Sequence, residues 1–111
     1  MKVESSRGQG VSVISPNGKL VIGEPVEIFE EAVVNLVDDG AKFLVIDLSG
    51  VSRIDSSGVG SLVAALRKCR DRGGDVRLAA PSDHLFKVLE MMGLMEVFEV
   101  HATVTEAEES F

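Results

Sequence analysis

Two adjacent serines, Ser56 and Ser57, are the side chains of this 111-residue sequence best placed for chemistry. They stand in the segment Ile54-Asp55-Ser56-Ser57-Gly58-Val59-Gly60, directly after an apolar run typical of a buried strand and directly before a helical pattern. A helix begins with unpaired backbone N–H groups and a partial positive charge, so a serine there can cap the helix or hold a phosphate. Spacing alone favours a cap, and both roles stay open at this point.

Other reactive groups are sparse. Cys69 is the single cysteine, so no internal disulfide can form, and its place on a predicted helix favours a partly buried small hydrophobe. His84 and His101 stand far apart without neighbouring ligands at metal-binding spacing, so we expect no metal and no cofactor. A hydrolase with Ser56 as nucleophile has little support, because no Gly-x-Ser-x-Gly elbow is present. We therefore expect a binding protein with no catalytic residues, not an enzyme.

Gly58 and Gly60 form a Gly-x-Gly fragment that is too short for a dinucleotide fingerprint. These glycines can let a partner approach the backbone closely, or they can serve tight packing within the fold. The sequence does not decide between the two roles.

Composition limits the class of partner. The chain is 45% apolar and 26% charged, which is typical of one folded domain spanning residues 1–111. Its net charge of −7 disfavours direct binding to nucleic acid or to anionic lipid, because both need a basic surface. The amino terminus lacks the apolar core of a signal peptide, and no apolar run approaches the roughly 20 residues of a membrane span. We expect a cytoplasmic protein without membrane insertion.

Predicted strands and helices alternate along the chain. Strands are predicted over residues 2–6, 11–15, 43–48, 76–79 and 97–101, with the first two antiparallel around Gly8-Gln9-Gly10. A turn is predicted at Pro16-Asn17-Gly18-Lys19, followed by a short extended piece over residues 20–22. Helical patterns begin near Pro25, Ser57, Asp83 and Thr103. The stripe on the third helix, which includes Met92, is predicted to be buried. This order indicates an α/β fold with a mixed sheet of four to five strands and about four helices.

The sequence resembles a STAS domain, and specifically the bacterial anti-sigma factor antagonists. The resemblance extends from Val11 through Phe98, and three segments carry it: Asp47-Leu48-Ser49-Gly50-Val51, Ile54 to Gly60, and Gly73-Gly74-Asp75-Val76-Arg77-Leu78. It implies a single STAS domain without a catalytic site of its own.

The resemblance also implies a function. Such a protein binds an anti-sigma factor that is also a serine kinase, and thereby frees a sigma factor. The phosphorylated residue of the family is the first serine of Asp-Ser-Ser-Gly, which falls on Ser56, and a separate serine phosphatase restores the hydroxyl. Ser57 is then expected to be a structural cap, while Asp55 either orients the loop or contacts the kinase. The expected partner-binding residues are Asp55, Ser56, Ser57, Gly58, Gly60 and Glu24.

One departure from the family pattern affects the choice of partner. Many relatives carry Gly-Glu-Leu-Asp before the first helix, and the best ungapped match here is Gly18-Lys19-Leu20-Val21. Val21 therefore replaces an acid, for which Glu24 is a possible substitute. An alternative is a STAS module of another assembly, in lipid transport, a stressosome-like complex or small-ligand sensing, without phosphorylation of Ser56. A monomer or a weak dimer is expected in either case.

Overall fold

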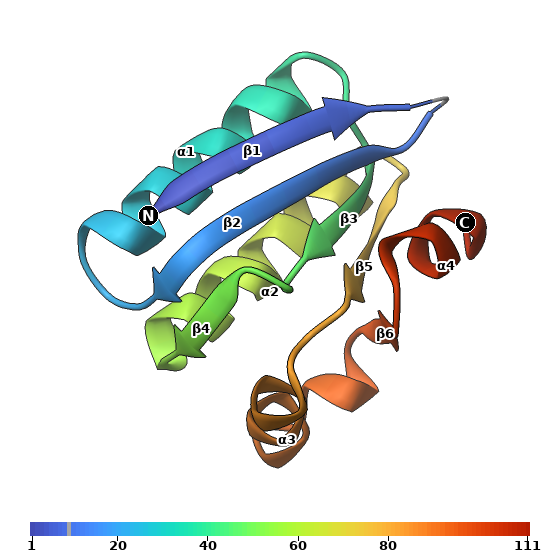
Figure 1. The fold of residues 1–111 in the computed structure, drawn as a ribbon. Coiled ribbons are helices and arrows are strands. Elements are labelled where there is room, and N and C mark those ends of the chain that lie inside the picture. Colours follow the sequence, from blue (N-terminus) through green and yellow to red (C-terminus); the bar gives the residue numbers. More distant parts are fainter. Residues whose placement is uncertain (9) are drawn as a thin grey trace.

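A mixed β-sheet carries helices on both faces in the computed structural model, which describes residues 1–8 and 10–111 (Figure 1). Helices α1 and α2 lie on one face, and the short helix α4 lies on the other (Figure 1). The described elements are β1 Lys2–Arg7, β2 Ser12–Leu20, α1 Glu24–Asp38, β3 Phe43–Asp47, β4 Val51–Ile54, α2 Ser56–Arg70, β5 Asp75–Ala79, α3 Asp83–Met91, the 3-10 turn η1 Leu94–Glu96, β6 Glu99–His101 and α4 Val104–Glu109.

The strands follow the order β1-β2-β3-β5-β6, and β4 pairs with the later part of β2. Strand β1 is antiparallel to β2, whereas the other pairs are parallel. The α/β class with a mixed sheet and an antiparallel start is therefore confirmed. Gln9, in the predicted reversal between the first two strands, lies outside the described residues.

The larger core lies between the sheet and helices α1, α2 and α3. Strand β3 is buried at its centre, where Leu44, Val45 and Ile46 have no exposed surface. Leu44 and Ile46 face α1 and α2, while Val45 packs on the opposite face with Ala79 and Ala107 of α4. This two-sided burial explains why the strand is apolar along its length rather than alternating.

The predicted turn at residues 16–19 is wrong, because β2 continues through it to Leu20. Pro16 pairs with Val3 of β1, and Gly18 has a φ of +116° at the point where the register with β4 shifts. A β-bulge, like a turn, accommodates glycine at positive φ and proline, which has no backbone N–H to donate. The proline and glycine therefore mark an irregularity within a strand.

Strand β4 was not predicted from the sequence. It has four residues, of which Ser52 and Arg53 are exposed, so it lacks the apolar run that marks a central strand. With it, the described sheet has six strands where four to five were expected. A second difference is Met92, which was expected in the core but is 41% exposed, because α3 ends at Met91 and the chain turns away at Gly93.

Arg77 fixes the carboxyl-terminal segment to the sheet. Its guanidinium lies 2.7 Å from Asp75 Oδ2 and 3.3 Å from Glu99 Oε2, and its Nε donates to Ser110 Oγ at 3.1 Å. It also lies 4.5 Å from the centre of the Phe111 ring, a cation–π contact. Among the described helices, none is long and apolar enough to cross a membrane.

Candidate functional site

Asp55 starts helix α2 directly after β4. Its side chain is the N-cap, with Oδ1 accepting a hydrogen bond from the Gly58 amide at 2.9 Å. Its carbonyl accepts from the Val59 amide, also at 2.9 Å. An aspartate suits this position because its oxygen satisfies an amide that the helix leaves unpaired, and its charge favours the positive helix end.

The second carboxylate oxygen of Asp55 reaches another segment. Asp55 Oδ2 accepts from the backbone N–H of Ile22 at 2.9 Å, which joins the loop before α1 to the start of α2. The hydrogen bonds from Ile22 and then from Gly58 hold the pKa of Asp55 below its ordinary value of 3.8. The loop residues 21–23 and the Asp55-Ser56-Ser57 segment therefore form one connected surface.

Ser56 is the first residue of α2 and is exposed. Neither Ser56 nor the half-buried Ser57 has a side-chain hydrogen bond within the part of the chain that the structure describes. The expectation that Ser57 caps the helix is wrong, because Asp55 takes that role. The Ser56 hydroxyl is thus presented to solvent at a helix N-terminus without a structural task.

The two glycines of this segment differ in their surroundings. A Cβ on Gly58 would overlap the carbonyl oxygen of Leu20 and would lie 2.7 Å from Cγ1 of Ile54, so only glycine lets α2 approach the end of β2 this closely. A Cβ on Gly60 would meet nothing within 4 Å. Tight packing therefore explains Gly58, but it does not explain Gly60.

The loop before α1 contributes an apolar side chain that the sequence analysis missed. The Ile22 side chain is 74% exposed, which is unusual for an isoleucine. Its backbone N–H is the one that donates to Asp55 Oδ2. Val21 is half-buried, and Glu24 is exposed as the first residue of α1. An exposed isoleucine looks the same in sequence as a buried one, so no pattern pointed to it.

The remaining reactive groups do not join this site. Cys69 is fully buried in α2, and desolvation raises the pKa of its thiol to about 11. His84 is exposed on α3, and His101 Nε2 lies 3.2 Å from Glu99 Oε1 at the edge of the sheet. Within the described residues, no group of three or more His, Cys, Asp and Glu side chains could hold a metal ion.

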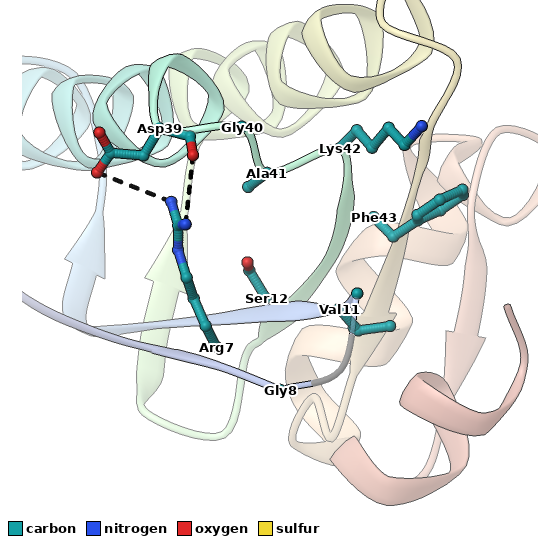
Figure 2. Close-up of a pocket in the computed structure, with 10 residues that line it drawn as sticks. Arg7, Gly8, Val11, Ser12, Asp39, Gly40, Ala41, Lys42 and Phe43 are labelled. Atoms are coloured by element: carbon teal, nitrogen blue, oxygen red, sulfur yellow. Dashed lines mark hydrogen bonds and ion pairs between the residues drawn. The ribbon is translucent and has the colours of Figure 1, made fainter.

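A hollow of 290 Å³ lies at the other end of the sheet, where β2 and β3 begin (Figure 2). Arg7 crosses it, donating to the carbonyl oxygens of Asp39 and Leu36, each at 3.3 Å. The buried Ser12 hydroxyl points toward the same space (Figure 2). Strands β2 and β4 are parallel, and Ser56 follows the carboxyl end of β4, beside the carboxyl end of β2. The hollow, at the amino ends of β2 and β3, is therefore separate from the predicted site.

Comparison with known proteins agrees with this architecture. Residues 2–107 match the family described as STAS domain, and the chain belongs to that family. The anti-sigma-B factor antagonist of Bacillus subtilis is 31% identical over 75 residues, which are 68% of each chain. The protein of that name in Listeria monocytogenes is 40% identical over 57 residues, 51% of this chain, so the match spans only half of that relative.

Two solved structures extend the comparison over nearly the whole chain. A crystal structure of an anti-sigma factor antagonist from Mycobacterium paratuberculosis has a TM-score of 0.83 and 27% identity, covering 98% of this chain and 92% of its own. The Bacillus cell fate determinant SpoIIAA in its phosphorylated form has a TM-score of 0.74 and 25% identity, covering 98% of both chains.

Proposed function

We propose that this protein is an anti-sigma factor antagonist that is switched off by a phosphate on Ser56. In its free form it binds an anti-sigma factor that is also a serine kinase, and a sigma factor is released. The observation that supports this most directly is the exposed Ser56 hydroxyl, which makes no hydrogen bond to any described residue because Asp55 caps the helix. The relatives named as antagonists, and the phosphorylated SpoIIAA structure, support the same role.

The fold should tolerate the phosphate. A phosphoserine carries about −1.5 to −2 charge and three acceptor oxygens, and a helix N-terminus offsets part of this by about 0.3–1 kcal/mol. Because the Ser56 hydroxyl is exposed and makes no hydrogen bond among the described residues, its modification breaks none of their hydrogen bonds. We therefore expect the switch to act without refolding.

The effect at an interface is much larger. Like charges brought together across an interface cost several kcal/mol, and each 1.4 kcal/mol lowers affinity about tenfold. A partner fitted to a neutral hydroxyl is therefore expected to dissociate once Ser56 is phosphorylated. A serine phosphatase would return the protein to its binding form.

The binding surface that we propose has two parts. Ser56, Ser57, Gly60 and Glu24 face the partner together with the exposed Ile22. Asp55 and Gly58 act beneath this surface: Asp55 binds the Ile22 amide, and Gly58 sets the approach of α2 to Leu20. We also propose that residues 1–111 act as one domain, as a monomer or weak dimer in the cytoplasm, with no enzymatic activity.

Phosphate mapping tests the proposed function. The purified chain is incubated with the anti-sigma serine kinases of its own genome and Mg-ATP, and peptides are sequenced by mass spectrometry. We expect one phosphate, on Ser56. Ser57→Ala is the matched control and should be phosphorylated like wild type, whereas Ser56→Ala should not. Phosphate confined to Ser57, or no phosphate with any such kinase, would instead favour a STAS module of another assembly.

A further inference from the structure

Two cations lie side by side on neighbouring strands close to the proposed site. Lys19 of β2 is in register with Arg53 of β4, and the next pair is Leu20 with Ile54. Leu20 and Ile54 are both buried, so Lys19 and Arg53 point to the opposite, solvent-exposed side. Neighbouring strands are about 5 Å apart, and like charges at such positions repel and destabilise the sheet.

Nothing within the described residues compensates this repulsion. Neither side chain takes part in any of the ion pairs or side-chain hydrogen bonds found among residues 1–8 and 10–111. Unpaired surface cations occur elsewhere in the chain, since the exposed Arg67 of α2 also has no ion pair among the described residues, but Lys19 and Arg53 are set apart because they stand in register on neighbouring strands. Although the sequence has 18 acids against 11 Lys and Arg, two like charges stand in register here. Folding alone gives no reason for it.

The cation pair is close to Ser56. Both strands end one residue beyond the pair, and Ile22 and Ser56 follow two residues later, where the hydrogen bond between Asp55 Oδ2 and the Ile22 amide joins the two segments. Three extended residues span about 10 Å. A protein interface of ordinary size covers about 800 Å² on each partner, a patch about 30 Å across. Lys19 and Arg53 therefore lie within the radius of an interface of ordinary size centred on Ser56.

We infer that Lys19 and Arg53 bind carboxylates on the surface of the anti-sigma partner. This inference rests on the proposed function and adds the charge of the partner's contact surface. On a chain of net charge −7, a local positive pair fixes the orientation of an acidic segment and rejects a partner that presents cations there. It also strengthens the switch, because a phosphate about 10 Å away repels the carboxylates that the pair has recruited.

Charge reversal tests the inference. The anti-sigma kinase that phosphorylates the chain is immobilised, and its affinity for wild type, Lys19→Glu, Arg53→Glu and Lys42→Glu is measured at low and high salt. We expect Lys19→Glu and Arg53→Glu to bind at least tenfold more weakly than wild type. Lys42→Glu makes the same charge change at the amino end of β3 and should bind within twofold of wild type. Wild-type affinity should fall with salt more steeply than that of either charge-reversed variant.

A stability measurement separates binding from folding. Lys19→Glu places opposite charges in register with Arg53, so its melting temperature should equal or exceed that of wild type. If both variants bind within twofold of wild type while Ser56 is still phosphorylated, the inference is wrong and the proposed function stands. If binding is unchanged but the KM for ATP rises, the pair serves the nucleotide, which also overturns it. A wild-type chain that binds no anti-sigma kinase overturns the proposed function itself.

Discussion

Asp55 and Ser56 have separate roles at the start of α2: Asp55 caps the helix, and Ser56 presents its hydroxyl to solvent. Both oxygens of Asp55 accept backbone hydrogen bonds, from Gly58 and from Ile22, so the aspartate is structural in the free protein. Ser56 is thereby left exposed. The sequence could predict that this segment begins a helix, but the choice of cap depends on which side chain meets the Gly58 amide, and that is decided by geometry.

Acid should weaken the fold through Asp55. Its pKa in the folded protein is below 3.8, so near and below that pH the unfolded chain binds more protons than the folded one. Stability that is present above pH 3.8 is therefore lost as the pH falls toward the folded pKa. Asp55→Asn keeps a capping oxygen but cannot titrate, so its urea-unfolding profile between about pH 5 and 3 should be flatter than that of wild type. Parallel profiles would contradict this role.

Cys69 should be chemically inert in the native protein. Burial raises the pKa of its thiol to about 11, so almost none of it is thiolate at neutral pH, and no reagent reaches it without unfolding. Ellman's reagent should release no thionitrobenzoate when it is added to the folded chain, and one equivalent in denaturant as Cys69 forms the mixed disulfide. Rapid reaction under native conditions would show that α2 opens easily or lies differently.

At the scale of elements, helix α2 brings the site together by its close approach to the end of β2. The motif around Ser56 and the helix that follows it were predictable, because strand, cap and helical stripe are local in sequence. Strand β4 and the passage of β2 through residues 16–19 were not predictable from local pattern. Pairing between strands overrode the turn propensity of Pro16 and Gly18, and the exposed residues of β4 hid its strand character.

The two glycines of α2 give a matched pair of variants. Gly58→Ala should destabilise the fold by about 1–3 kcal/mol, because its methyl group would overlap the Leu20 carbonyl and force α2 outward. Gly60→Ala should stabilise it by about 0.5–1 kcal/mol, because its methyl group enters open space and alanine favours a helix.

Equilibrium urea unfolding measures both effects. Gly60→Ala should also bind the kinase more weakly than wild type if a partner approaches that backbone, so affinity and stability would move in opposite directions. A loss of stability in Gly60→Ala equal to that in Gly58→Ala would contradict the packing described for this helix.

At the scale of the whole molecule, the two faces of the sheet are covered by hydrophobic cores of very different size. Helices α1, α2 and α3 cover the large core, whereas the short α4 covers only a small cluster around Val45 and Ala79. Contacts of Arg77 hold α4 and Phe111 over that smaller face. No sequence pattern indicated this arrangement, because it joins residues of β5, β6 and the last turn of the chain.

Removal of the Arg77 side chain should cost about 1.5–3 kcal/mol, because Glu99 loses its arginine partner, Asp75 keeps only Arg70, and Ser110 loses the hydrogen bond from Arg77. Arg77→Ala should lower the urea midpoint accordingly. Phosphorylation of Ser56 should stay near the wild-type rate well below the melting temperature, because β5 does not contribute to the proposed site. A midpoint within error of wild type would show that α4 is held by other contacts.

The central claim is that a phosphate on Ser56 prevents docking while the fold persists. The most direct measurement is the affinity of the anti-sigma kinase for the unmodified and the Ser56-phosphorylated chain, with circular dichroism of both forms. We predict at least a hundredfold weaker binding of the phosphorylated chain, from about 3 kcal/mol of like-charge repulsion, with superimposable spectra. Equal affinities, or a phosphorylated chain that has lost its folded spectrum, would contradict the account.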